Sequence, residues 1–80
     1  MDRMTLEEFR ALRSLQDRRV HMIFSDGQEL IATLLSVSTD MDESRHLVYD
    51  KVEWSTVALP EGHPGPWYSP GENLVILRSL

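Results

Sequence analysis

The segment from Val20 to Glu53 constrains the fold of this chain more than any other, because its apolar residues recur with a period of two. Val20, Met22 and Phe24 alternate with His21, Ile23 and Ser25, the period of two that is typical of a β-strand. Asp26-Gly27 follows as a hairpin signal, since glycine tolerates the positive φ that primed hairpin turns require. The segment therefore predicts a first strand that turns directly into an antiparallel second one.

The second strand, predicted over 29–38, is apolar on both faces, which is typical of a strand bent around a barrel. The alternation places Leu30, Ala32 and Leu34 on one face and Ile31, Leu35 and Val37 on the other. An acidic loop over 39–45 leads to a third strand over 46–54. There, Val48, Val52 and Trp54 are expected on one face and Leu47 and Tyr49 on the other.

The N-terminal part predicts a helix over 5–17. Thr5 and Glu8 have the spacing of a capping box, in which each side chain bonds the other residue's backbone amide. The helix has one apolar stripe, formed by Leu6, Phe9, Leu12 and Leu15. We expect this stripe to pack on the barrel.

The C-terminal part, from residue 55 onward, is rich in proline and glycine. Residues 55–70 hold all four prolines, which predicts a long loop with a short strand near Trp67-Tyr68. Gly71-Glu72 is typical of a tight turn, and residues 73–77 predict a closing strand that is apolar on both faces. Because an unpaired apolar edge strand promotes aggregation, that strand is expected either at the centre of the barrel or covered by another subunit.

Composition narrows the class of protein. Eighty residues indicate one domain over 1–80, with the helix at about 5–17 and the barrel at about 19–79. The chain has no cysteine, no apolar run long enough to span a membrane and no N-terminal signal pattern, so we expect a cytoplasmic protein. The net charge of −5 disfavours non-specific nucleic-acid binding, although four of the eight basic residues lie between Arg10 and Arg19.

The helix followed by five strands resembles the Sm-like family. The first motif of that family is similar to Val20–Phe24, Asp26-Gly27, Leu30–Val37, His46–Asp50 and Glu53, and its second motif is similar to Ser69–Leu77. The resemblance implies a small, strongly bent five-stranded antiparallel barrel of mainly β class with an N-terminal α-helix. It also implies a homo-oligomeric ring of six or seven subunits, in which the fourth strand of one subunit pairs with the fifth of the next.

The resemblance further implies single-stranded RNA as a partner, bound at a pore-side site. At three positions where the family binds the nucleotide, this sequence has Ser38, His46 and Pro70. Pro70 supplies neither a positive charge nor a backbone N–H donor at its position. The RNA-binding residues we expect are His46, Arg45, Asp42 and Gly71. The subunit interface is expected at Leu74, Val75, Ile76, Leu77, Trp67 and Tyr68.

Other readings compete with RNA binding. The same barrel would serve as a protein-interaction scaffold whose nucleotide pocket has decayed, or as a monomeric SH3-like module that binds a peptide over Trp54, Trp67 and Tyr68. Ser38, His46 and Asp50 have the residue types of a catalytic triad, but nothing in the sequence fixes their geometry. The sequence also has no nucleophile elbow and no phosphate-binding glycine loop, so we expect no enzymatic activity. We also expect no cofactor and no metal, because the acidic loop at Asp40, Asp42 and Glu43 lacks the glycine of an EF-hand.

Overall fold

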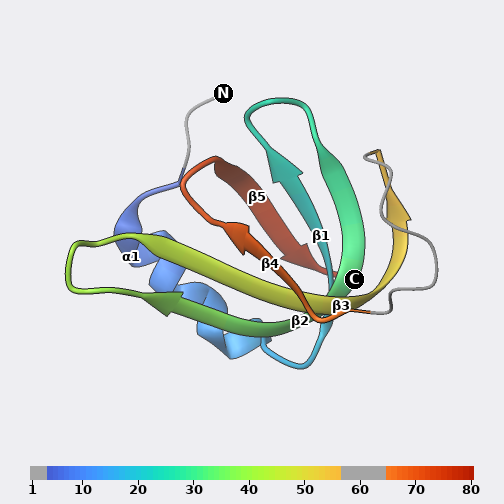
Figure 1. Cartoon of the computed structure of the whole chain (residues 1–80), viewed down its shortest axis with the longest axis horizontal. Coiled ribbons are helices and arrows are strands. Elements are labelled where there is room, and N and C mark those ends of the chain that lie inside the picture. The colour runs from blue at the N-terminus through green and yellow to red at the C-terminus, as the bar shows by residue number, and fades with distance from the viewer. Residues whose placement is uncertain (1–3, 57–64) are drawn as a thin grey trace.

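The computed structural model describes residues 4–56 and 65–80. In these residues a short helix precedes one antiparallel sheet with the strand order β4-β3-β2-β1-β5 (Figure 1). The elements are α1 (Leu6–Ala11), the 3₁₀ helix η1 (Leu12–Leu15), β1 (Arg19–Phe24), β2 (Glu29–Thr39), β3 (Arg45–Ser55), β4 (Trp67–Pro70) and β5 (Leu74–Ser79). The prediction of a helix and five antiparallel strands is confirmed. β4 and β5 do not pair within the described residues, so the sheet is not closed into a barrel.

The N-terminal capping box is confirmed. The Glu8 amide donates to Thr5 Oγ1 at 3.1 Å, and the Thr5 amide donates to Glu8 Oε1 at 2.9 Å. The prediction of one helix as far as residue 17 is wrong, because the α-helix ends at Ala11 and a 3₁₀ turn follows it. Asp17 then takes a φ of 68° and donates its amide to the Leu34 carbonyl at 2.6 Å, which turns the chain onto the sheet.

The hairpin between β1 and β2 forms where the Asp26-Gly27 pair predicts it. Phe24 and Gln28 close the loop through the Phe24 amide and the Gln28 carbonyl at 2.9 Å. Gly27 has a φ of 91°, whereas Asp26 keeps a negative φ. The connection is therefore a three-residue loop with glycine in the left-handed position, and not a primed turn.

β2 begins as predicted, with Leu30, Ala32 and Leu34 buried. Val37, however, is buried with them and not on the opposite face, because the pairing with β3 shifts between Leu34 and Ser36. A bulge of this kind adds one residue to one strand and so reverses the alternation beyond it.

β3 shows a second interruption of the same kind. Leu47 and Tyr49 are buried as predicted, but Val52 packs against the core and does not share the face of Val48. Lys51 has a φ of 50°, so the strand does not keep its period of two across this residue. Trp54 remains 47% exposed.

β4 confirms the short strand predicted near Trp67-Tyr68, and the Leu74 amide donates to the Gly71 carbonyl at 3.1 Å in the predicted tight turn. β5 pairs with β1 alone among the described strands, so the first of its two expected positions, at the centre of the barrel, is wrong. Leu74 and Leu77 are buried, whereas Val75 and Ile76 are half-buried at this edge.

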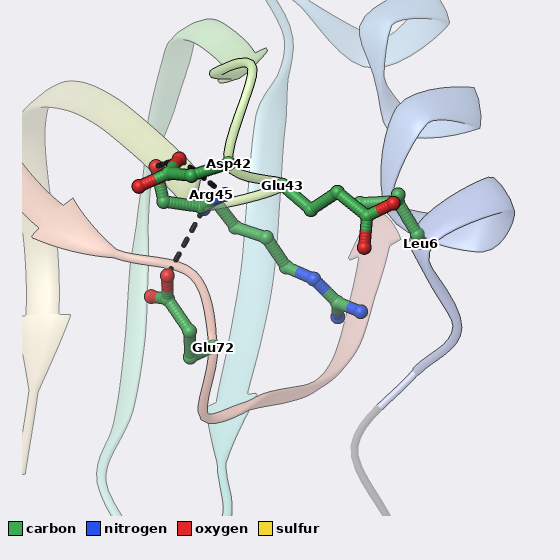
Figure 2. Close-up of a pocket in the computed structure, with 6 residues that line it drawn as sticks. Leu6, Asp42, Glu43, Arg45 and Glu72 are labelled. Atoms are coloured by element: carbon green, nitrogen blue, oxygen red, sulfur yellow. Dashed lines mark hydrogen bonds between the residues drawn. The ribbon is translucent and has the colours of Figure 1, made fainter.

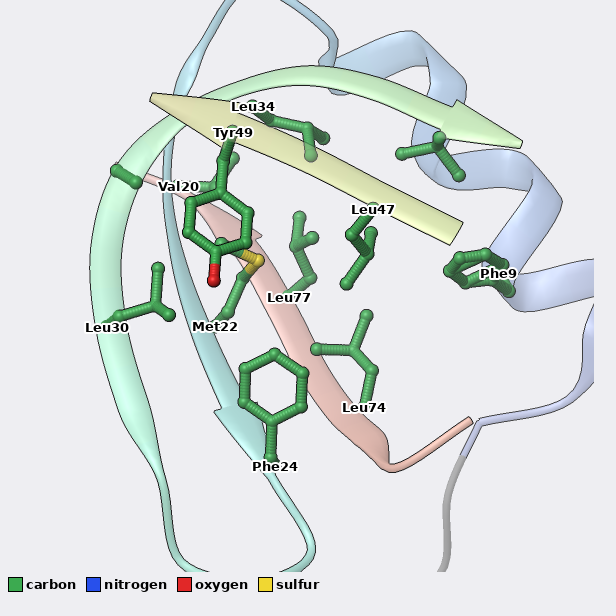
Figure 3. Packing of buried hydrophobic residues seen from close by; sticks show 12 residues of the cluster. Phe9, Val20, Met22, Phe24, Leu30, Leu34, Leu47, Tyr49, Leu74 and Leu77 are labelled. Carbon is green, nitrogen blue, oxygen red and sulfur yellow. The ribbon is translucent and has the colours of Figure 1, made fainter. Parts of the chain in front are cut away.

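Figure 3 shows the core as one cluster between the concave side of the sheet and the helix. Phe9 is the helix residue in it, fully buried against side chains from the sheet, and Met4, Leu12 and Leu15 pack around the cluster as partly buried neighbours. The buried members are Phe9, Val20, Met22, Phe24, Leu30, Ala32, Leu34, Val37, Leu47, Tyr49, Leu74 and Leu77. None of the helices in the described parts of the chain has the length and apolarity needed to cross a membrane.

Candidate functional site at the ends of β2, β3 and β4

Three positions that the Sm-like resemblance links to nucleotide binding form one row across the sheet. Ser38 of β2 is the partner of His46 of β3, and His46 is the partner of Pro70 of β4. Residues directly opposite each other on antiparallel strands have Cβ atoms about 4.5–5.5 Å apart. The fold therefore brings together residues separated by up to two fifths of the chain, from Ser38 to Pro70, and His46 lies at the centre of the row.

His46 is held at both ring nitrogens. Its Nε2 lies 2.8 Å from Asp40 Oδ2 and 3.1 Å from Ser44 Oγ, and its Nδ1 contacts the Tyr68 hydroxyl. The imidazole and phenol rings have centroids 5.6 Å apart and planes tilted by 32°. The His46 side chain is 24% exposed and that of Asp40 is 67% exposed, so this group of side chains is accessible from solvent.

The turn between β2 and β3 positions the acidic side of this group. The Asp40 amide donates to the Ser44 carbonyl at 3.0 Å, and Glu43 adopts a φ of 65° at the turn. Asp42 Oδ1 accepts from the Ser44 hydroxyl at 2.7 Å and from the Ser44 amide at 3.1 Å. These two bonds, the hydroxyl first, lower the pKa of the Asp42 carboxyl because they stabilise its ionised form.

A hollow of about 320 Å³ lies beside the turn, between β3 and the helix (Figure 2). Its lining is rich in carboxylates, and consists of Leu6, Asp42, Glu43, Ser44, Arg45 and Glu72. Glu72 Oε1 accepts from the Arg45 amide at 3.0 Å, and this bond lowers the pKa of the Glu72 carboxyl. No group of three or more ionisable ligands in the described residues has the arrangement of a metal site.

Arg45 and Gly71, two of the predicted RNA-binding residues, take part in packing the helix. Arg45 Nη1 donates to the Met4 carbonyl at 2.7 Å, and the guanidinium lies 5.6 Å from the centroid of the Phe9 ring. Gly71 donates its amide to the Arg45 carbonyl at 2.8 Å. A Cβ on Gly71 would lie only 2.7 Å from Phe9 Cζ, so this position needs glycine for close packing.

No family model, curated protein or solved structure matches this chain. The geometry of the described residues is therefore the basis for a functional assignment.

The predicted interface residues divide into two groups. Leu74 and Leu77 are buried in the core of their own chain, and Trp67 packs partly against it. Val75, Ile76 and Tyr68 are accessible, and Tyr68 is 58% exposed.

Sequence reasoning missed the contact between Tyr68 and His46, and the roles of Ser44 and Glu72. Pro70 is the partner of His46, and Tyr68 lies two residues before Pro70 on the same face of β4. This spacing was the one feature of the sequence from which the contact between Tyr68 and His46 could have been predicted.

A second hollow, of about 190 Å³, is lined by Phe24, Asp26, Gln28, Leu30, Tyr49, Ser69, Pro70 and Asn73.

Proposed function

We propose that this chain is a non-enzymatic, Sm-like scaffold that assembles into a ring and acts through protein contacts, with a nucleotide pocket that has decayed. The observation that carries the proposal is the position of β4 and β5 at the two edges of the sheet. Edge strands present unpaired backbone donors and acceptors, which other chains readily pair with. If β4 of one subunit pairs with β5 of the next, the backbone donors and acceptors of both edges form hydrogen bonds. The same contact between each pair of neighbouring subunits closes a ring.

The connection between β4 and β5 supports the strongly bent barrel of the Sm-like family. In a flat sheet the two outer strands of five would lie roughly 19 Å apart, four strand spacings of about 4.8 Å. The link from Pro70 to Leu74 has only residues 71–73 between strands, and four Cα steps span at most roughly 14 Å. The sheet has to curl for these residues to reach from one edge to the other.

The charge around His46 favours a scaffold over an RNA-binding ring. Asp40, Asp42, Glu43 and Glu72 surround the ends of β2 and β3, and the nearby Arg45 guanidinium is already engaged by the Met4 carbonyl and the Phe9 ring. Binding to nucleic acid depends on cations that neutralise phosphates. Carboxylates at this position would repel a phosphate backbone.

One observation supports RNA binding as a second candidate function. His46 and Tyr68 form an accessible pair of rings, and unstacked bases bind to such rings in single-stranded RNA recognition. A neutral stacking contact of this kind does not need a cation, so it does not depend on the positive charge that is absent at Pro70.

The size of the protein in solution tests the ring. Light scattering after size-exclusion chromatography is expected to give a hexamer or heptamer. Val75→Lys places a charge at the half-buried β5 edge, a common way to block edge pairing, and should reduce the particle to a monomer. Met41→Lys is the matched control, because Met41 is fully exposed at the β2–β3 turn and away from both edges. A monomeric wild type would refute the ring and favour the SH3-like peptide-binding module.

Fluorescence anisotropy with short oligo-U and oligo-A at low salt separates the two ring functions. The scaffold predicts no binding at tens of micromolar protein. If an oligonucleotide binds, His46→Ala should weaken the binding while the particle size stays unchanged, and the RNA-binding alternative would then replace the scaffold.

A further inference from the structure

The neighbours of His46 distinguish its two ring nitrogens. Asp40 Oδ2 lies 2.8 Å from Nε2, and a carboxylate oxygen accepts hydrogen bonds but does not donate them. In the tautomer that satisfies this contact, Nε2 carries the hydrogen and Nδ1 is an acceptor. The Tyr68 hydroxyl contacts Nδ1, so in this tautomer the phenol is the hydrogen-bond donor.

Ser44 reinforces this arrangement. Its hydroxyl lies 2.7 Å from Asp42 Oδ1 and 3.1 Å from His46 Nε2. When the hydroxyl hydrogen points at Asp42, the serine oxygen offers a second acceptor to the Nε2 proton. Two acceptors at Nε2 stabilise the imidazolium that forms when Nδ1 takes up a proton, as in the general arrangement of nucleophile, base and orienting group.

The two tyrosines of the chain differ in access and in partner. Tyr68 is 58% exposed and its hydroxyl contacts an imidazole nitrogen. Tyr49 is 5% exposed and its hydroxyl pairs with Ser69 Oγ at 2.8 Å, a neutral partner, and no histidine among residues 4–56 and 65–80 bonds to it. Tyr49 is thus a reference within the same molecule for a phenol without activation.

We propose that Tyr68 is an activated nucleophile that accepts acyl groups, with His46 as its general base and Asp40 as a positioning residue. The phenolic oxygen attacks the carbonyl carbon of an activated acyl donor, and Nδ1 of His46 takes the phenolic proton. A carbon–oxygen bond to Tyr68 forms and the bond from the acyl carbon to its leaving group breaks. His46 then passes the proton to the leaving group, so the products are the tyrosyl ester and the protonated leaving group.

This reactivity goes beyond the proposed scaffold and does not depend on it. Side chains stand roughly perpendicular to a sheet, so backbone pairing at the β4 edge does not by itself cover the Tyr68 phenol. Acetylation measured at each tyrosine separately tests the reactivity of Tyr68 in a ring and in a monomer alike.

N-acetylimidazole is the acyl donor for the test, with acetylation at each tyrosine followed by peptide mass spectrometry. In the wild type, Tyr68 should be acetylated at neutral pH about 10-fold faster than in His46→Gln, which is below the roughly 10²–10⁴-fold typical of general-base catalysis because the site is open to water. His21→Gln is the matched control: His21 contacts Glu29 at 3.1 Å on β1, away from this site, and its loss should leave the rate unchanged.

The pH dependence separates activation from simple exposure. The dependence of the acetylation rate on pH should differ in shape between the wild type and His46→Gln, because only the wild type has a ring nitrogen in contact with the Tyr68 hydroxyl that can take the phenolic proton. Asp40→Asn should lower the rate and alter the pH profile without changing the circular dichroism spectrum. Equal rates in wild type and folded His46→Gln, or acetylation of Tyr49 as fast as Tyr68, would overturn the proposal.

Discussion

Gly71 shows how a single residue fixes the contact between the helix and the sheet. Its φ is not in the left-handed region, but a Cβ would lie 2.7 Å from Phe9 Cζ and 2.9 Å from Arg45 Cβ. Gly71→Ala should therefore destabilise the fold by about 1–3 kcal/mol, the usual cost of overpacking. Urea unfolding measures the loss, and the double variant with Phe9→Leu should recover part of the added cost. A Gly71→Ala protein as stable as the wild type would contradict this.

Glu72 gives the same region a dependence on pH. Its folded pKa is lowered from 4.5, chiefly by the bond from the Arg45 amide. A lowered pKa stabilises the fold fully above the unfolded value and loses that contribution as the pH falls through the folded value. The wild type should thus be more stable than Glu72→Gln at pH 7, and the difference should vanish in acid well below 4.5. Urea unfolding at a series of pH values tests this, with Glu43→Gln as the control that keeps the Arg45 contact.

At the scale of elements, the helix depends on its cap. An α-helix of six residues is too short to be stable alone, so α1 relies on its capping box and on the burial of Phe9. Thr5→Ala should lower the free energy of unfolding by about 0.5–2 kcal/mol, while Thr5→Ser keeps the hydroxyl and should cost much less. Chemical denaturation of both variants checks the difference, and equal losses would show that the hydroxyl bond is unimportant.

The sequence predicted those elements whose alternation is unbroken. β1 and the Asp26-Gly27 loop formed where expected, because every second residue from Val20 to Phe24 is apolar and buried. The predicted faces of Val37 and Val52 were wrong, because irregularities near Ser36 and Lys51 interrupt the alternation of the two strands. Serine and lysine are not residue types from which a bulge can be predicted. Lys51 is not a residue that favours the left-handed region.

The candidate site was predictable to a similar extent. The Sm-like resemblance assigned Ser38, His46 and Pro70 to positions that it links to nucleotide binding. The register of β2, β3 and β4 places these residues in one row across the sheet. The contacts of His46 with Asp40 and Tyr68 depend on the conformation of the β2–β3 turn and on the register of β3 with β4, neither of which a local sequence pattern fixes.

At the scale of the whole molecule, the proposed ring should make stability depend on concentration. Assembly that involves only the folded state stabilises that state by mass action. The melting temperature of the wild type should therefore rise with protein concentration, and that of Val75→Lys should not. Differential scanning calorimetry over a hundredfold range of concentration tests this. A wild-type melting temperature that is constant over this range would argue against assembly.

Both edges of the sheet come from one short stretch of the chain, since β4 and β5 are separated only by residues 71–73. Replacement of the whole stretch 65–80 therefore alters both halves of the proposed joint in a single genetic event. Two diverging copies of such a gene would keep matching edges within each copy while losing the match between copies. This arrangement would allow related rings to separate into distinct assemblies in one cell without any change to the core.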